Sequence, residues 1–491
     1  MKKSQFFLLL LILLLALFFR TYQIVERSYF GHDADLYSWM VKDIVVNHHF
    51  RLVGQETSAP GIFIGPLFYY SLVPFFILFN MDPIAAVIPI TIVGLLTVIS
   101  YYFVFTKLFN KGVGLIAAFL YAILLSPAVW FDRTIAPSTP TNLWTIWYFY
   151  TIVSLSRGNF KALPILGILI GLIWHLHIAL IPSLIAIPFS FFVAGKFPKS
   201  SQIFKFAIAL FITSLPLIIF EVKHNFQQTL SLLQNFTTEK EGVAKGFYKF
   251  QIVLNMISKN ISNLFFAPHS SKITNNIFFP VILLLSSLWL IRKKLITKKE
   301  LIPLLFWILG MVLFFSLSST PISEYYFYNI EIIFLTLISL LLYSLLKFSW
   351  GKFFVIGLLI IIASKNIYVL LTDNPYRKGY VERKAVVDYI VADAKNKNFP
   401  CFSVNYITSP GENVGFRYFF YLKNAHLAVA GRGSPVYSIV LPDEYALKEI
   451  EAKFGHIGII TPKEIASKEI INDACSGQNT NLTDPMLGYV E

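Results

Sequence analysis

The sequence QFFLLLLILLLALFFR, residues 5–20, is almost entirely apolar, and YFGHDADLYSW follows it at 29–39. A membrane-spanning helix needs roughly 20 mostly apolar residues to cross a hydrocarbon core about 30 Å thick. Only Lys2 and Lys3 carry charge before the apolar run, which has no small-residue cleavage site. The run therefore predicts a retained anchor helix rather than a removed signal peptide. Asp33 and Asp35 then lie just beyond the end of a membrane span.

Composition indicates that the first span is one of many. The 491 residues are 56% hydrophobic, 16% aromatic and only 14% charged, and the mean hydropathy is +0.64. Such a chain is too apolar for a soluble multidomain protein. The formal net charge of +14 does not indicate nucleic-acid binding, because no basic stripe interleaved with aromatic residues occurs on a soluble segment. We therefore predict a polytopic α-helical membrane protein, with lipid as its surroundings.

Apolar length predicts about eleven transmembrane helices. They are expected at 5–20, 84–106, 112–130, 139–156, 162–176, 178–195, 203–220, 276–292, 301–318, 326–346 and 352–371.

The charged connections predict the orientation. Short basic loops, such as those with Lys107 and Arg157, are expected in the cytoplasm together with the N-terminus, by the positive-inside rule. Most acidic residues of the membrane part then lie outside, and Glu300 is the main cytoplasmic acid. We expect an integral protein of a bacterial plasma membrane, whose chemistry takes place at the extracytoplasmic face.

The first outer loop, 21–83, is expected to contain two juxtamembrane elements. With residue 21 outside and Lys107 inside, only one of the apolar stretches 62–79 and 84–106 can cross. The first is rich in proline and glycine, so we expect it to pack against protein without spanning. The segment 37–50 has helical spacing with Lys42 and Asp43 on its polar face, which predicts an interfacial helix.

The composition changes after residue 371. Residues 372–491 alternate helix-like and strand-like patterns, which predicts a small α/β or α+β extracytoplasmic domain following a membrane domain at 1–371. This part contains the only two cysteines, Cys401 and Cys475. Either a disulfide or two free thiols is compatible with their spacing.

Several motifs occur in a defined order. An Asp-x-Asp pair after the first span is followed by SAPGIFIGPLFYY (58–70), RTIAPSTP (133–140), HLH (175–177) and LPLIIFEVKHNF (215–226). In this order, residues 1–371 resemble a GT-C glycosyltransferase, of the bacterial branch near the protein O-mannosyltransferases and aminoarabinose transferases. The resemblance implies a sugar donor carried on polyprenyl phosphate and inverting transfer at the outer membrane face. The acceptor varies across the family.

Transfer from a lipid phosphate needs a base for the acceptor proton, positive charge for the leaving phosphate and an apolar groove. A phosphodiester leaving group is stable as an anion, so no strong general acid is required. Asp33 occupies the position of the family's first-loop aspartate and is the expected base. The family often has a second acid directly afterwards; here Ala34 intervenes before Asp35.

Three roles are open for Asp35. It could assist catalysis, bind a divalent cation such as Mg²⁺ or Mn²⁺ together with Asp33, or cap a helix that begins at Leu36. No cofactor is otherwise indicated.

The remaining candidate residues all lie near predicted outer ends of spans. Arg133 is suited to a bidentate phosphate contact, although snorkelling or a pair with Asp132 would place it there too. Further candidates for phosphate or sugar contacts are His177, Lys223 and His224, with His32, Asp132, His175, Glu221, Glu324 and Tyr325 as additional possible site residues. The loop 222–275 is a candidate lid.

Three other protein classes remain open. A lipid or glycan flippase or transporter would carry charges near the bilayer midplane and show repeated halves, whereas here the acids gather at one face. An outer-face glycan ligase or polymerase would share the lipid-linked donor and the electrostatics of the site. A non-catalytic sensor would keep its function after Asp33→Asn.

Overall fold

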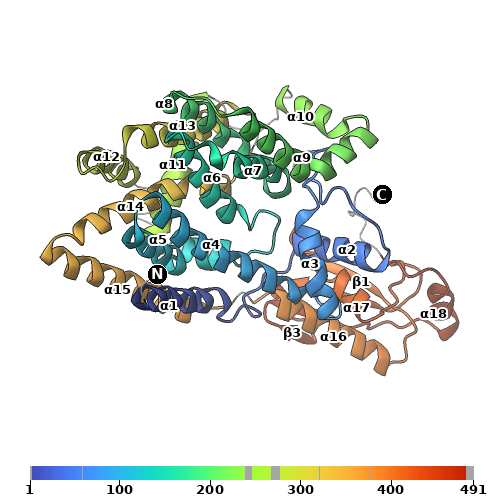
Figure 1. Ribbon diagram of the computed structural model, residues 1–491. Helices are drawn as coiled ribbons and strands as arrows, with labels where there is room; N and C mark the ends of the chain where they lie inside the picture. Colours follow the sequence, from blue (N-terminus) through green and yellow to red (C-terminus); the bar gives the residue numbers. More distant parts are fainter. Residues whose placement is uncertain are drawn as a thin grey trace.

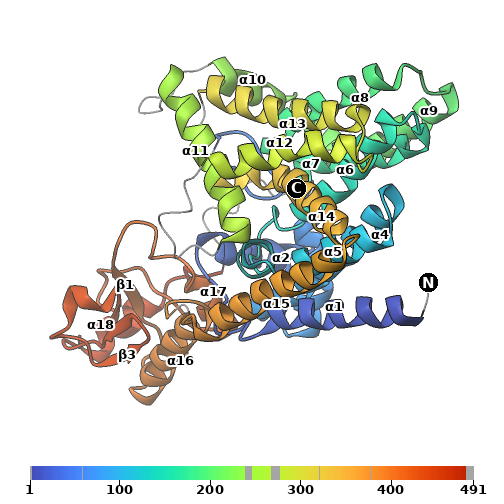
Figure 2. The ribbon, with the colours of Figure 1, turned by 90° about the vertical axis from the view of Figure 1, so that its left-hand side faces the viewer.

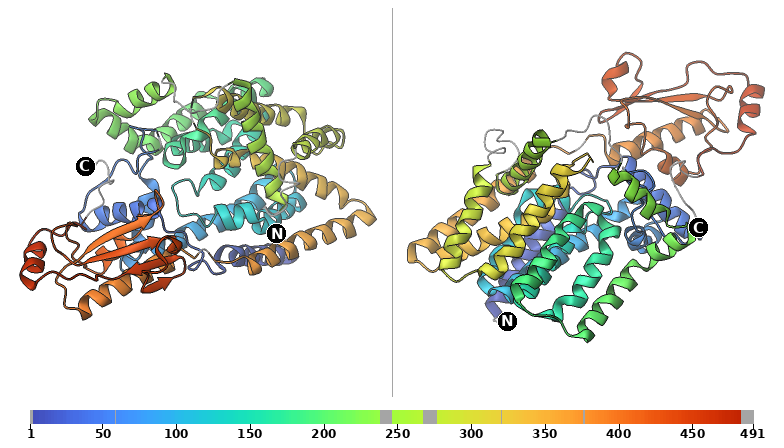
Figure 3. Two further views of the ribbon diagram at one scale, coloured as in Figure 1. Left: turned by 180° about the vertical axis from the view of Figure 1, so that it is seen from behind. Right: turned by 90° about the horizontal axis from the view of Figure 1, so that it is seen from above.

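A computed structural model describes residues 3–57, 59–237, 246–266, 277–319, 321–375 and 377–482. It consists of a large helical bundle with a small mixed-sheet domain at one end, and helices α2 and α3 lie between the two parts (Figure 1). Figure 3 gives the same arrangement from two further sides, with the sheet domain projecting from the bundle. The structure is thus mostly helical, as the sequence predicts.

Six helical segments are long and apolar enough to cross a membrane. They are α1 (Lys3–Thr21), Pro83–Leu108 with α4 (Val87–Leu108), α9 (Ser200–Lys223), α13 (Lys298–Leu317), Glu324–Leu345 with α14 (Glu331–Leu345), and α15 (Ser349–Thr372). Six of the roughly eleven predicted spans are therefore confirmed.

The other five predicted spans are helices that are shorter or more polar. Four are short apolar helices: α5 (Lys111–Ile123), Phe160–Leu176 with α7 (Leu163–Leu176), Ile178–Ala194 with α8 (Ala186–Ala194), and α12 (Phe278–Arg292). The expected span 112–130 ends at Ile123 because Pro127 cannot continue an α-helix, and Ser126–Phe131 forms a π-helical turn. The fifth, α6 (Thr141–Ser156), is buried over almost its whole length, so its Thr and Ser side chains contact protein.

A buried ion pair fastens α1 to the centre of the bundle. Arg20 Nη2 lies 2.6 Å from Asp132 Oδ2, and both side chains are almost completely buried. Tyr121 donates a hydrogen bond to the same carboxylate at 3.0 Å. A Cβ atom on Gly94 would lie 2.7 Å from Arg20 Nε, so α4 needs glycine here to approach α1 closely.

The residues expected in the cytoplasm lie together. Arg157 Nε donates to Glu300 Oε1 at 2.5 Å, and Arg157 Nη2 donates to the carbonyl of Leu108 at 2.9 Å. At the opposite end, Arg27 after α1 pairs with Asp373 after α15 at 3.0 Å, and the two helices approach each other there at an angle (Figure 2). The residues predicted to lie inside and those predicted to lie outside are thus at opposite ends of the helical bundle.

Helices α2 (His32–Val46) and α3 (Leu67–Leu78) share a hydrophobic core with the C-terminal domain. Trp39 of α2, for example, packs edge to face against Tyr418 at 5.3 Å between ring centroids. The prediction that Lys42 and Asp43 form an exposed polar face is wrong, because both are buried. Arg51 compensates the charge of Asp43 at 2.9 Å, so α2 can be buried on both faces.

The C-terminal domain contains a four-stranded mixed sheet in the order β1-β2-β4-β3. Strands β1 (Ser403–Thr408) and β2 (Val436–Leu441) are parallel, whereas β4 (Ile457–Ile460) pairs antiparallel with β2 and with β3 (Ala452–Phe454). The helices are α16 (Tyr380–Asn396), α17 (Arg417–Leu422) and α18 (Lys468–Cys475). A disulfide joins Cys401 to Cys475, with 5.5 Å between their Cα atoms.

The candidate lid 222–275 is largely helical. It contains α10 (Gln227–Thr237) and α11 (Gly246–Phe265), and α11 buries one face against the bundle. The intervening residues 238–245 and the segment 267–276 lie outside the described residues, so the lid stays a prediction.

Candidate functional site

A cavity of about 950 Å³ lies where α1 and α15 end, between the bundle and the C-terminal domain. Three separated chain segments and one hairpin turn form its walls. The lining side chains that carry polar or charged groups or bulky rings are Arg27, Tyr29, Asp33, Trp130, Arg133, Thr134, Asp373, Asn374, Arg377, Lys378 and His456. Two of the residues singled out by sequence, Asp33 and Arg133, therefore lie in one cavity.

Asp33 lies in the first turn of α2 and is exposed to this cavity. The positive end of the helix dipole stabilises a carboxylate in that position. The charge of Asp33 acts on two neighbouring hydroxyl groups, those of Tyr69 and Tyr325. Burial raises the pKa of Tyr69, and the charge of Asp33 raises it further. Asp33 is thus an accessible carboxylate beside neutral phenols.

Asp35 faces a different environment from Asp33. Residues two apart on a helix point about 200° apart, and Asp35 is 97% buried, with a relative exposure of 3%. Its carboxylate accepts hydrogen bonds from the backbone amides of Gly415 at 3.4 Å and Tyr418 at 3.3 Å. The capping role proposed for Asp35 is wrong, since α2 begins at His32 after Gly31.

Asp33 and Asp35 are also not placed to bind one metal ion together. Among the described residues, no group of three or more His, Cys, Asp or Glu side chains is arranged to hold a metal ion. Asp33 and Asp35 therefore do not form the joint Mg²⁺ or Mn²⁺ site that their spacing suggested, because Asp35 is bound to backbone amides of another domain.

Arg133 follows the π-helical turn and extends along the wall of the cavity. Its Nε donates to the carbonyl of Phe19 at 3.0 Å, whereas its buried Nη1 has no hydrogen-bond partner among the described residues. Burial, together with the positive charges of Arg27 and Arg20, lowers the pKa of Arg133 to about 10. The guanidinium remains charged at neutral pH, and an anion beside it would supply the missing partner.

The cavity has more positive than negative charge. Arg27 is paired with Asp373, and Lys378 is paired with Glu412. Arg377 has no acidic side chain within 4 Å in the part of the chain that the structure describes. With Arg133, it leaves two cations available to an anionic ligand in the cavity that Asp33 also lines.

Arg27, Arg377, Lys378 and His456 are cavity residues that sequence reasoning missed. The run RK at 377–378 follows the last span directly, and this basic pair outside the membrane was a usable signal. No such signal marked His456 in the sequence, because only folding brings the β3–β4 turn next to the linker. There the backbone amide of His456 donates a hydrogen bond to the carbonyl of Arg377 at 2.9 Å.

Two of the other predicted candidates lie together near Asp33. Tyr325 contacts His177 with 3.4 Å between its hydroxyl and Nε2, and the two rings meet edge to face. His177 Nδ1 accepts from the backbone amide of Ala179 at 3.0 Å and caps the following helical turn. Burial lowers the pKa of His177, which lies between two apolar helices, to about 4. His177 is therefore neutral at pH 7, and its predicted contact with the donor stays a prediction.

The remaining candidates are not among the described residues that line the Asp33 cavity. Asp132 pairs with Arg20 rather than with Arg133, and His175 Nε2 bonds to the carbonyl of Thr213 at 3.0 Å. Glu324 pairs with Lys259 at 2.6 Å. His224 stacks on Phe220 at the end of α9, next to Lys223, and His32 is the first residue of α2.

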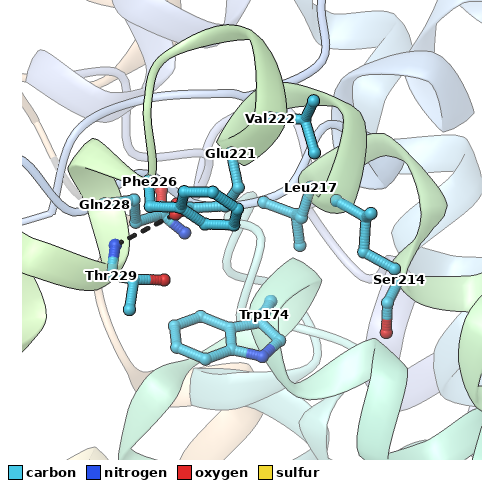
Figure 4. A pocket seen from close by; sticks show the side chains of 9 residues that line it. Trp174, Ser214, Leu217, Glu221, Val222, Phe226, Gln228 and Thr229 are labelled. Carbon is cyan, nitrogen blue, oxygen red and sulfur yellow. Dashed lines mark hydrogen bonds between the residues drawn. The ribbon is translucent and has the colours of Figure 1, made fainter.

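Glu221 lines a second, smaller cavity of about 250 Å³. This cavity lies where α7, α9 and α10 meet, and Figure 4 presents its side chains.

The fold matches those of solved membrane glycosyltransferases. No protein-family model and no curated protein matches the sequence. The crystal structure of ArnT from Cupriavidus metallidurans bound to undecaprenyl phosphate aligns with a TM-score of 0.57 at 12% identity, covering 95% of this chain and 100% of ArnT. The chain has the ArnT fold. The resemblance to the GT-C class is thereby confirmed at the level of the fold.

Two further structures agree. ArnT from the same organism in the apo state aligns with a TM-score of 0.56 at 10% identity, covering 92% of this chain and 97% of ArnT. The oligosaccharyltransferase AglB from Archaeoglobus fulgidus, in complex with an inhibitory peptide and a dolichol-phosphate, aligns with a TM-score of 0.50 at 13% identity. That alignment covers 95% of this chain and 75% of AglB.

Proposed function

We propose that the protein is a membrane glycosyltransferase that moves a sugar from a polyprenyl-phosphate donor to an acceptor hydroxyl at the extracytoplasmic face. One observation carries this proposal: an exposed carboxylate, Asp33, lies in the same cavity as a guanidinium, Arg133, whose buried Nη1 has no partner in the described chain. The reaction requires two such groups: a base for the acceptor proton and a cation that binds the leaving phosphate.

The proposed step uses each group once. Asp33 accepts the proton of the acceptor hydroxyl while the hydroxyl oxygen attacks the anomeric carbon of the donor. The bond from that carbon to the phosphate oxygen breaks, and the bonding pair leaves with the polyprenyl phosphate. Arg133 stabilises the anionic leaving group through charge-assisted hydrogen bonds. Attack from the face opposite the phosphate inverts the anomeric configuration.

The lipid-linked nature of the donor is supported by the cavity wall and by the fold. Val129, Trp130 and Ile135 give the wall next to Arg133 an apolar surface. The ArnT structure contains undecaprenyl phosphate and the AglB structure a dolichol-phosphate, which are polyprenyl phosphates. The sugar and the acceptor are outside this proposal; a glycolipid, a cell-wall glycan or a protein would each supply a hydroxyl.

The sorting of charges supports the proposed extracytoplasmic position of the site. Arg157 and Glu300 occupy one end of the bundle, and the Asp33 cavity occupies the end where α1 and α15 finish. The positive-inside rule assigns the first end to the cytoplasm. A disulfide between Cys401 and Cys475 supports an oxidising compartment for the domain next to the cavity.

The decisive experiment supplies the purified protein in lipid with radiolabelled polyprenyl-phosphate sugars and a membrane extract as acceptor source. We expect wild type to consume one donor and Asp33→Asn to consume none, although it folds and binds undecaprenyl phosphate. Movement of a lipid-linked sugar across the bilayer by both proteins, without consumption, would establish a flippase instead. Polymerisation of lipid-linked glycans would keep the site but change the acceptor to a second donor molecule.

A further inference from the structure

The second cavity lies between three helices at the predicted outer end of α9. Trp174 of α7 forms its floor, Leu217 and Glu221 of α9 form one side, and Phe226, Gln228 and Thr229 close the other side (Figure 4). Its volume of about 250 Å³ is below the range of about 300–1,000 Å³ for drug-sized ligands. The cavity therefore fits a small group of a few heavy atoms.

Glu221 is the one charged residue among the described residues that line this cavity. Its Oε2 accepts a hydrogen bond from the backbone amide of Thr229 at 3.3 Å. Its other oxygen, Oε1, is buried and has no hydrogen-bond partner in the described part of the chain. A buried carboxylate oxygen without a partner is costly, and a ligand that brings a positive charge would remove this cost.

The apolar walls favour the same kind of ligand. Trp174 and Phe226 present aromatic rings to the cavity (Figure 4), and aromatic faces attract cations through their quadrupole. No basic side chain is found among the lining residues that the structure describes, so an anion would have no counter-charge.

Phe226 is held in an uncommon conformation at the mouth of this cavity. Its φ angle is +58°, directly after Asn225 at +52°, a region that bulky L residues rarely adopt. The residue is nevertheless 56% exposed. Backbone strain of this kind gathers at ligand sites, and here it places an exposed aromatic ring beside the carboxylate of Glu221.

We propose that this cavity binds an alkylammonium group, held by Glu221 and enclosed by Trp174 and Phe226. The source of the ammonium group is either a lipid head group or a soluble amine. Val222 and Phe226 line the cavity and are exposed and apolar, which suits a mouth that opens to the head-group region of a bilayer. The proposal does not depend on glycosyl transfer, because the Asp33 cavity has different lining residues.

The test measures binding to the purified full chain by calorimetry. Choline and its neutral isostere 3,3-dimethyl-1-butanol differ only in charge, and we expect choline to bind at least about tenfold more tightly. This comparison needs no variant. Tighter binding of the isostere than of choline, or equal affinity for the two ligands, would overturn the proposal.

Variants then locate the site. Glu221→Gln keeps the shape of the side chain and is expected to weaken choline binding about tenfold. Trp174→Phe is expected to retain most of the affinity and Trp174→Leu to lose it. Glu444→Gln, an exposed position in the C-terminal domain, is the matched control. Equal affinity of Glu221→Gln and wild type would place the ligand elsewhere and refute the assignment.

A third measurement separates the two sources. The protein is placed in nanodiscs of phosphatidylethanolamine or of phosphatidylglycerol, and bound lipids are counted by native mass spectrometry. Retention of one phosphatidylethanolamine by wild type, and its loss in Glu221→Gln, would identify a lipid head group. Binding of ethanolamine in solution without lipid retention would identify a soluble amine; both results support the proposed chemistry.

Discussion

Asp35, near the start of α2, accepts a hydrogen bond from the backbone amide of Tyr418 in the C-terminal domain at 3.3 Å. Asp33, two residues earlier, is exposed in the cavity beside Arg133. The two acids of the motif thus have different surroundings: one holds two parts of the protein together, and the other is available to a substrate.

This difference predicts opposite results for two matched substitutions. Asp33→Asn removes the proposed base and is expected to lower the turnover number by about 10²–10⁴-fold without changing the unfolding temperature. Asp35→Asn cannot accept both amide hydrogen bonds and is expected to lower the free energy of unfolding by about 1–3 kcal/mol. Turnover per folded molecule and thermal unfolding measure the two effects. Loss of turnover in both variants with unchanged stability would contradict this division.

Arg133 is expected to control donor affinity. Arg133→Ala removes the proposed phosphate contact and should weaken binding of undecaprenyl phosphate about 10–100-fold, the worth of a charge-assisted hydrogen bond. Arg133→Lys keeps the charge without the bidentate geometry and should be intermediate. Lys423→Ala, which removes one half of a partly exposed pair with Asp388, is the control. Unchanged affinity in Arg133→Ala would place the phosphate elsewhere.

The ion pair between Arg20 and Asp132 is expected to stabilise the bundle rather than the reaction. Arg20→Met leaves the Asp132 carboxylate buried and unpaired, which typically costs about 3–5 kcal/mol. The double variant Arg20→Met with Asp132→Leu should recover much of this loss. Lys259→Ala breaks the half-exposed pair with Glu324 and should change stability by about 0–1 kcal/mol.

Thermal unfolding in lipid nanodiscs measures the stability of all three variants. Equal effects of Arg20→Met and Lys259→Ala would show that burial of the Arg20 pair is unimportant.

His177 should make stability depend on pH on the acidic side. Its pKa is about 4 in the folded protein and about 6.5 in an unfolded chain. The unfolded state therefore binds more protons between these values, and stability falls as pH falls from about 6.5 towards 4. His177→Gln should flatten this slope, whereas His48→Gln, at an exposed position, should not. Parallel slopes for wild type and His177→Gln would contradict the burial of a neutral imidazole.

The two cysteines provide a test of orientation. A membrane-impermeant maleimide added to intact cells should label the protein only after reduction, because Cys401 and Cys475 are joined in the fold and are the only cysteines in the sequence. Labelling of inverted vesicles but not of cells would place the C-terminal domain in the cytoplasm and reverse the proposed topology.

The sequence predicted the class of fold and singled out Asp33 and Arg133, which line one cavity in the structure; their roles stay predictions. Span length marks where α1 and the segment 112–130 end, so Asp33 and Arg133 stood out as polar groups just beyond apolar runs. The same reasoning failed for Lys42 and Asp43. Helical spacing indicated an exposed face, but Arg51, eight residues beyond Asp43, neutralises that carboxylate and allows its burial.

Long-range contacts account for the rest. The partners of Asp35 are backbone amides almost 400 residues away, and an amide leaves no signature in the side-chain pattern. Arg377 and His456 reach the cavity only because the linker and the β3–β4 turn pack together. Neither relationship could be inferred from local periodicity or charge.

The hydrophobic core common to α2, α3 and the sheet domain limits how this protein can be recombined. A chimera that replaced only the chain after residue 372 would set foreign side chains against Trp39 and leave Asp35 opposite unfamiliar amides. The smallest transplantable piece is therefore discontinuous, combining the loop between the first two spans with the C-terminal region. Homologues that exchanged these two segments jointly would keep their fit, whereas those that exchanged one alone would need compensating substitutions in the other.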